Sequence, residues 1–289
     1  MRWRSVLTGQ VTQFSRFASA RHLSRMLAVL LAIPAEAQQI PATTAGVSPG
    51  AAVDSLHVGQ PLARFDLLRP GTHRYLRYAI VNGRRMPIDL WTRTVSMEDH
   101  DGVRRLRIRQ RWDELGEPPL SLDQDAWFEL GTFRPLTHVK TRRHGDTVTV
   151  GGYRFLPDRI VGMNGLPGNV RKGFSVAASE PAFDFEYDME LLQTLPLRDG
   201  YRVSIAFYDP GLDPPARYTF VVAGSASMDG PDGRPIDCWV VTADYNTGHV
   251  VNRFWFAKRT QVLVREEGRT PDGRLLVKTL LNPEAGDGG

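Results

Sequence analysis

The chain has 289 residues, with 36 Lys and Arg against 32 Asp and Glu. Five arginines and one glutamate lie in residues 1–37, so 31 basic and 31 acidic residues remain once that segment is set aside. A chain without net charge lacks the basic footprint that nucleic-acid binding requires, and that class of partner is excluded.

The first 37 residues have the features of a secretory signal peptide. An apolar run at residues 26–34 follows several arginines, and the small residues Ala35 and Ala37 suit cleavage before Gln38. The run is shorter than the roughly 20 residues that span a bilayer, so we expect export without stable membrane insertion. The arginine-rich, acid-free residues 1–25 also suit a mitochondrial transit peptide, but the cleavage site decides against it; a translation start at Met26 stays open.

Basic-residue usage and the single cysteine indicate the compartment and the source of stability. Arginine supplies 32 of the 36 basic residues, a skew typical of GC-rich bacterial genomes, and together with export this favours the periplasm. Cys238 has no partner cysteine for an intramolecular disulfide, so a packed core must stabilise the chain. We expect Cys238 to be buried in a strand.

Beyond the cleavage site, composition divides the chain into three parts. Residues 38–63, rich in Pro, Ala, Gly and Ser, predict a disordered linker. Residues 64–283 predict one antiparallel β domain, and residues 284–289 a disordered tail. Within the domain, runs of alternating polarity are separated by turn dipeptides, namely Asn82-Gly83, Asp101-Gly102, Asp199-Gly200 and Asp272-Gly273.

The strand predicted at residues 103–112 carries an arginine at every second position. The four that share one face are Arg105, Arg107, Arg109 and Arg111. Leu106, Ile108 and Trp112 project to the opposite face. At the strand rise the guanidinium groups form a line about 20 Å long. Arginine forks bind carboxylate or phosphate, so this face is a candidate binding site for an anionic glycan or lipid headgroup. The alternative is a solvent face whose arginines pair with Asp and Glu on neighbouring strands.

Other polar patterns are less specific. Residues 98–101 offer metal-ligand types, but the turn at Asp101-Gly102 favours a solvated loop. Residues 162–168 match no phosphate-binding glycine motif and predict a flexible loop, and residues 224–228 lack the closing glycine of a nucleophile motif. No metal-ligand spacing occurs among His73, His138, His144 and His249. We therefore expect no metal, no cofactor, and structural roles for the histidines.

Residues 184–195 predict a short helix, because Leu191-Leu192 breaks the strand alternation while Phe185, Met189 and Leu192 share a helical face. Pro196 ends it. The next strands alternate again, with one face formed by Tyr201, Val203, Ile205 and Phe207, and another by Tyr218, Phe220 and Val222. Residues 236–244 and 250–258 are apolar on both faces and predict central strands covered on both sides, joined by a turn at Asn246-Thr247-Gly248.

Several of these segments have a characteristic order. They are LPLRDG at 195–200, the strand at 201–208, DGPDGRPIDCWV at 229–240, NRFWFAK at 252–258 and VLVR at 262–265, with FRPL at 133–136 and YRFLPDRIVG at 153–162 upstream. Over roughly residues 70–281 this pattern resembles an exported bacterial family labelled domain of unknown function 3108. The resemblance implies an all-β fold, an antiparallel β-barrel or half-barrel with one short helix, in the cell envelope. It implies no activity and supplies no catalytic residues.

Together these observations predict an exported, non-catalytic binding or envelope-assembly factor for an anionic or amphipathic envelope molecule. A hydrolase of envelope glycans or lipids is the alternative, because paired carboxylates converge only in space. An outer-membrane barrel is disfavoured, since it needs a lipid-facing apolar band that the arginines at 105–111 interrupt. Oligomeric state is not predicted.

Overall fold

A computed structural model of the chain describes residues 52–211, 214–230, 233–248, 250–270 and 273–281. These residues form a 16-stranded sheet, two 3-10 turns and one short α-helix. The elements are β1 (Asp54–Leu56), η1 (Phe65–Leu67), β2 (Gly71–Val81), β3 (Arg84–His100), β4 (Val103–Glu114), β5 (Leu120–Glu129), β6 (Pro135–His144), β7 (Thr147–Phe155), β8 (Arg159–Gly162), β9 (Ser175–Ala177), β10 (Phe183–Asp184), η2 (Phe185–Tyr187), α2 (Asp188–Gln193), β11 (Arg202–Tyr208), β12 (Ala216–Asp229), β13 (Pro235–Ala243), β14 (Asn252–Ala257), β15 (Leu263–Arg269) and β16 (Leu275–Leu280). Within this part of the chain, no helix is long and apolar enough to cross a membrane.

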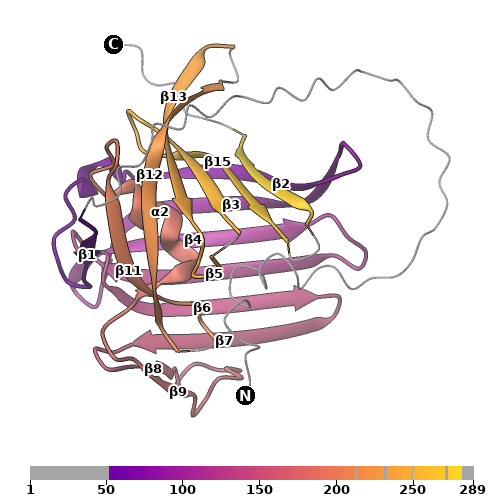
Figure 1. The fold of residues 1–289 in the computed structure, drawn as a ribbon. Helices are drawn as coiled ribbons and strands as arrows, with labels where there is room; N and C mark the ends of the chain where they lie inside the picture. Colours follow the sequence, from indigo (N-terminus) through magenta and orange to yellow (C-terminus); the bar gives the residue numbers. More distant parts are fainter. Residues whose placement is uncertain (1–51, 212–213, 231–232, 249, 271–272, 282–289) are drawn as a thin grey trace.

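The strands form one continuous curved sheet (Figure 1). Its order is β1-β11-β12-β13-β14-β15-β16-β2-β3-β4-β5-β6-β7-β8-β9. Two short strands, β1 and β10, pair in parallel with different parts of β11, and the long neighbouring strands pair antiparallel. The hydrogen-bonded order of the described strands ends at β9 without returning to β1. The sheet is therefore an open half-barrel, which confirms the predicted fold class.

The two halves of the sheet enclose the helix. In Figure 1 the strands from β3 to β7 run across the view, β11 and β12 stand nearly upright against them, and α2 lies between. Strand β16 joins the halves, because it pairs with β15 on one side and with β2 on the other. Inward side chains from both halves meet on the helix, which places the core inside the curve.

Two of the predicted turns have the backbone that a tight hairpin requires. At Asn82-Gly83, between β2 and β3, φ is 50° and 73°, and at Asp101-Gly102, between β3 and β4, φ is 52° and 73°. Two successive residues with positive φ match the right-handed twist of the flanking strands, and Asn-Gly or Asp-Gly adopts this conformation at the lowest cost. These turns set the register of the long strands β2 to β4.

The helix is buried on every side. The single turn η2 continues into α2, and the whole segment is shorter than the predicted 184–195. The Asp184 side chain caps its start by accepting a hydrogen bond from the Glu186 N–H, 3.2 Å away. The predicted apolar face is confirmed, since Phe185, Met189 and Leu192 all belong to the main core.

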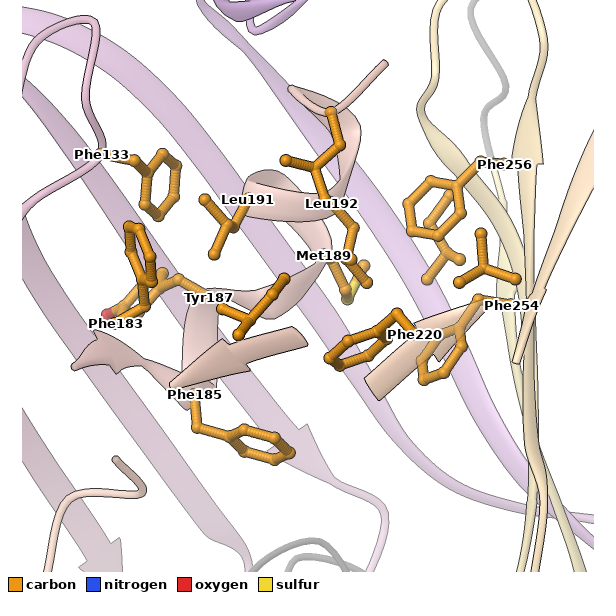
Figure 2. Packing of buried hydrophobic residues seen from close by; sticks show 14 of the residues in the cluster. Phe133, Phe183, Phe185, Tyr187, Met189, Leu191, Leu192, Phe220, Phe254 and Phe256 are labelled. Carbon is orange, nitrogen blue, oxygen red and sulfur yellow. The ribbon is translucent and has the colours of Figure 1, made fainter. Parts of the chain in front are cut away.

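Figure 2 shows how the helix fills the half-barrel. Leu191 points towards Phe133, while Leu192 lies on the side that faces Phe254 and Phe256. Both phenylalanines of β14 are fully buried. Each such side chain contributes roughly 1.5–3 kcal/mol when it leaves water. The helix thus supplies the interior that the two sheet halves could not fill alone.

A second, smaller core forms where β7 and β8 approach β11. Tyr153 and Ile160 pack here with Ala206 and Tyr208 of β11. The Tyr208 hydroxyl also accepts a hydrogen bond from the Gly211 N–H at 3.0 Å. Side-chain packing rather than a strand ladder therefore joins these two parts of the half-barrel.

The structure differs from the predicted linker at residues 38–63. Asp54–Leu56 forms β1 along the edge of β11, and Leu62 is buried in the main core. Because a short edge strand is held by backbone hydrogen bonds, it needs no apolar alternation of its own, and composition did not reveal it. The predicted tail at residues 284–289 lies outside the described residues.

The predicted covering of β13 and β14 on both faces is wrong. Val241 and Phe254 are buried towards the helix, whereas Val240 and Trp255 on the outer face are only half-buried. The two strands do pair through the predicted turn, where Tyr245 and Asn246 have positive φ. Cys238 is buried in β13, as expected, and burial raises the pKa of its thiol to about 12.

The glycine-containing loop after β8 is packed rather than free. Buried Asn169 accepts hydrogen bonds from the Gly152 and Arg171 N–H groups and donates to the Met163 carbonyl. A Cβ on Gly162 would lie 1.8 Å from the Arg171 carbonyl oxygen. Glycine is therefore needed at position 162 because two backbone segments approach each other closely there, which explains this glycine without a bound ligand.

Candidate functional site

Strand β4 places its arginines on the outer face, as predicted. Leu106, Ile108 and Trp112 are buried towards the helix. The outward arginines lie between β3 and β5, whose facing residues are largely acidic or polar. In register they face Glu98, Ser96, Thr94 and Thr92 of β3, and Glu129, Trp127, Asp125 and Asp123 of β5.

Arg107 is held rigidly at the centre of this face. Its guanidinium donates to both Asp125 oxygens, at 2.9 and 2.6 Å, and to Glu98 at 2.9 Å. It also lies 4.8 Å from the centroid of the Trp127 ring, whose other neighbour His100 stacks at 4.1 Å. Arg107, Trp127 and His100 thus form a fixed stack, which we call the Trp127 stack.

Arg111 also forms ion pairs with carboxylates of the sheet. It lies 2.7 Å from Asp113 and 3.1 Å from Asp123, and Asp123 in turn contacts Arg143 of β6. These contacts are solvent-exposed pairs of the kind that contributes little to stability.

Arg105 stands next to two carboxylates that other cations engage. Glu98 accepts from Arg107, and Glu129 accepts from Arg134 at 3.0 Å. Hydrogen bonds from Arg134 and Thr132 lower the pKa of Glu129 to about 2. Among the described residues, no carboxylate forms an ion pair with Arg105.

The acidic neighbour of Arg109 is likewise engaged by another arginine. Its register partners are Thr94 and Asp125, and both oxygens of Asp125 already accept from Arg107. In the part of the chain that the structure describes, Arg109 likewise has no ion pair. The predicted four-arginine face therefore resolves into two paired arginines and two that are open to a ligand.

The remaining predicted polar residues do not form a joint site. Glu98 contacts Arg107, Asp99 contacts Arg104 and His100 stacks on Trp127, so the residues at 98–101 do not converge. Within the described ranges, no group of three or more His, Cys, Asp and Glu could hold a metal ion. His249 and the cleavage residues Ala35, Ala37 and Gln38 lie outside the described residues.

A layer of charged residues between the helix and the sheet was missed by sequence reasoning. Its acids alternate with apolar residues in one segment, and all are buried. They are Asp184, Glu186, Asp188 and Glu190. Their short spacing was visible in the sequence, but only the apolar residues of the segment were assigned to a face.

Basic side chains of the sheet meet these acids. The contacts are His138 Nδ1 to Asp184 at 2.8 Å, Lys140 to Glu186 at 2.5 Å, and Arg93 Nε to Glu190 at 2.6 Å. Burial alone would raise the pKa of Glu186, but the charge of Lys140 holds it below its usual value. Lys278 of β16 pairs similarly with buried Glu266. The pairs of Asp184, Glu186 and Glu190 fix the helical segment to the sheet.

Two further acids titrate near neutrality. Burial and the charge of Glu266 raise the pKa of Asp188 to about 7. Burial and the charge of Asp89 raise the pKa of Glu114, at the end of β4, to about 7. A general acid for hydrolysis has a raised pKa, so Asp188 and Glu114 are the candidates for that role in the hydrolase alternative.

The fold and this surface define a class: an open β-barrel-like protein with an enclosed helix and a charged outer sheet face. The chain belongs to the family described as protein of unknown function (DUF3108), whose model matches residues 77–277. This confirms the resemblance inferred from the sequence.

Two solved structures are similar to the chain. One is a β-barrel-like protein of domain of unknown function DUF1849 from Brucella abortus, with 10% identity and a TM-score of 0.45, covering 74% of this chain and 99% of that one. Another is the hypothetical lipoprotein YmcC from Escherichia coli (K12), with 15% identity and a TM-score of 0.29, covering 75% and 89%. No curated protein sequence matches.

Proposed function

We propose that the protein is an exported, non-catalytic binding factor of the bacterial cell envelope that holds an anionic glycan or lipid headgroup on the outer face of β4. The observation that carries this proposal is the pairing pattern of the face. Arg105 and Arg109 have no ion pair among the described residues, because Arg107 and Arg134 engage the neighbouring carboxylates.

The spacing suits a ligand with more than one anionic or polar group. Arg105 and Arg109 are four residues apart on one strand, which separates their Cα atoms by about 13 Å. The Trp127 stack lies between them and does not need to reorganise when a ligand arrives. The fixed stack keeps the spacing of the two open guanidinium forks constant, so the forks can bind the anionic groups of a ligand without reorganisation of the sheet face.

Non-catalytic binding is favoured by the acids of the same face. Hydrogen bonds from Ser96 and Arg107 lower the pKa of Glu98, and Arg134 and Thr132 do the same for Glu129. Both stay ionised at neutral pH and cannot protonate a leaving group, as glycoside hydrolysis would require. The two acids with raised pKa lie on the other side of the sheet: Asp188 is on the enclosed helix, and Glu114 is at an inward position of β4, two residues after Trp112.

The experiment compares two double variants with the same loss of charge. Arg105→Gln with Arg109→Gln should remove the open forks, whereas Arg111→Gln with Arg143→Gln removes two arginines that already pair with carboxylates. Titration with acidic glycans and anionic headgroups should show a loss of roughly 1.5–3 kcal/mol per broken charge-assisted bond for the first variant only. Equal affinity of the two variants would contradict the proposal, and so would turnover of the ligand by the purified protein.

Export and periplasmic location are part of the proposal and need their own measurement. The apolar run at 26–34 and the small residues Ala35 and Ala37 support cleavage before Gln38. The intact mass of the protein isolated from periplasm should match a chain that begins at Gln38. A periplasmic form that keeps residues 26–34 would contradict it.

A further inference from the structure

The antiparallel strands β3 to β7 end in two rims of different character. One rim carries the turn at 82–83, the loop at 115–119 and the turn at 145–146, and we call it the Leu115 rim. The opposite rim of the same strands carries the turn at 101–102, the loop at 130–134 and the turn at 156–158. Neighbouring strands are about 4.8 Å apart, so each rim spans about 19 Å from β3 to β7.

The Leu115 rim exposes large apolar side chains on three of its strands and loops. Exposed fractions are 65% for Leu115, 58% for Val148 and 53% for Met86. Leu115 is fixed in this position because its N–H donates to the Ile88 carbonyl at 3.0 Å. On the opposite rim, Val103, Leu130 and Leu156 are less exposed, at 46%, 37% and 37%.

A fourth apolar side chain extends this surface along β7. Val170 is 62% exposed, and its N–H donates to the Val150 carbonyl at 2.9 Å, two positions from Val148. The preceding Asn169 is buried and ties the loop to Gly152 on β7. Val170 is therefore held outwards by an anchored loop and does not turn in to cover its own apolar surface.

Basic side chains without acidic partners surround these residues. Arg84, Arg85, Arg142 and Lys172 are exposed, and no carboxylate among the described residues forms an ion pair with them. The exposed acids here are Glu117 and Asp146. The Leu115 rim thus combines an apolar surface with an excess of positive charge.

Arginines beside the turns of the opposite rim are engaged instead. Three pairs form there: Arg104 with Asp99 at 3.6 Å, Arg134 with Glu129 at 3.0 Å, and Arg159 with Asp158 at 2.8 Å. Arg154, one strand position further in, is exposed without such a pair. On the Leu115 rim Arg143 is paired too, with Asp123, so the contrast between the rims rests on the four unpaired bases named above and on the degree of apolar exposure.

We propose that the Leu115 rim docks the protein onto an anionic lipid bilayer. Leu115, Met86 and the two valines enter the headgroup boundary, while the unpaired basic groups contact lipid phosphates. An apolar cluster ringed by basic residues is the surface that peripheral binding to anionic lipids requires. Contact at the rim leaves the outer face of β4 free, so this surface is separate from the proposed ligand site.

The test is co-sedimentation of the full chain with vesicles of phosphatidylcholine alone or mixed with phosphatidylglycerol. The wild type should bind the mixed vesicles, bind neutral vesicles weakly, and be released by salt. Met86→Ser with Leu115→Ser should reduce binding, whereas Val103→Ser with Leu130→Ser on the opposite rim should not. All variants share the same N-terminal segment, so a difference between them reports on the rim.

A second pair of variants isolates the charge. Arg84→Gln with Lys172→Gln should weaken binding about fivefold for each removed base, while Arg104→Gln with Arg159→Gln should change it little. Circular dichroism confirms that each variant folds. Equal losses at the two rims, equal binding to neutral and anionic vesicles, or no vesicle binding at all would each overturn the proposal, the last in favour of a protein partner. Unchanged ligand affinity in the rim variants would show that the proposed ligand site is independent.

Discussion

Replacing Glu190 with Gln should destabilise the protein strongly, because it leaves the Arg93 guanidinium buried without its counter-charge. Arg93 donates to both Glu190 oxygens and also to Gln110 and the Glu186 carbonyl. Removing one partner of a buried pair costs roughly 3–5 kcal/mol. Domains of this size unfold with about 5–15 kcal/mol, so the loss is a large part of the total. The melting temperature should fall by about 2–4 °C per kcal/mol.

Urea unfolding with an unchanged m-value measures the effect. The control is Asp158→Asn, which breaks the solvent-exposed pair with Arg159 and should cost less than about 1 kcal/mol. Replacing Arg93 and Glu190 together by Met should recover most of the lost stability, since both charges then leave the core. The reasoning fails if Glu190→Gln costs no more than Asp158→Asn, or if the double variant is as unstable as the single one.

Three further outcomes are expected. The pKa of Asp188 is about 7 in the folded protein against 3.8 ordinarily, so the folded state binds this proton more tightly and the group's contribution to stability falls as pH rises between these values. Asp188→Asn should therefore remove this loss of stability with rising pH. If the free energy of unfolding depends on pH in the same way in the variant and the wild type, the prediction is wrong. Gly162→Ala should destabilise by about 1–3 kcal/mol or more in thermal melts, because its Cβ meets a carbonyl oxygen, whereas Gly165→Ala has open space and should be nearly neutral. Phe256→Ala should cost about 3–5 kcal/mol by chemical denaturation, and a loss below 1 kcal/mol would show that the interior collapses to fill the space.

The outer arginine face was predictable because strand geometry has a period of two. Once residues 103–112 are assigned to a strand, Arg105 and Arg109 must lie on the face opposite Leu106 and Ile108. Which of the arginines pair with carboxylates depends on the register with β3 and β5. The Asp101-Gly102 turn indicates the register with β3, but the longer loop at 115–119 gives no such signal for β5. Ligand binding by Arg105, Arg107, Arg109 and Arg111 stays a prediction.

The buried charge layer was not predictable for a different physical reason. Arg93 and His138 are polar residues at inward positions of their strands. They interrupt the alternation of apolar and polar residues, and their burial can be explained only when their partners are known. Those partners, Glu190 and Asp184, lie far away in the sequence, on a segment whose burial follows from the curvature of the whole sheet. Similarly, β1 is defined by its neighbour β11 and carries no pattern of its own.

The pairing of β16 with β2 has a consequence for how the chain reaches its native state. The first long strand, β2, pairs on one edge with β16, which is about 200 residues later in the sequence, and β1 likewise pairs with the distant strand β11. A ribosome delivers residues in order, so this edge of β2 stays open until β16 has been synthesised. Contacts between such distant residues form slowly, because a long loop must close before any pairing energy is gained. The sheet therefore cannot close around the helix until β16 is available, so the two halves must be held in solution without their shared strand while the segment between them is made.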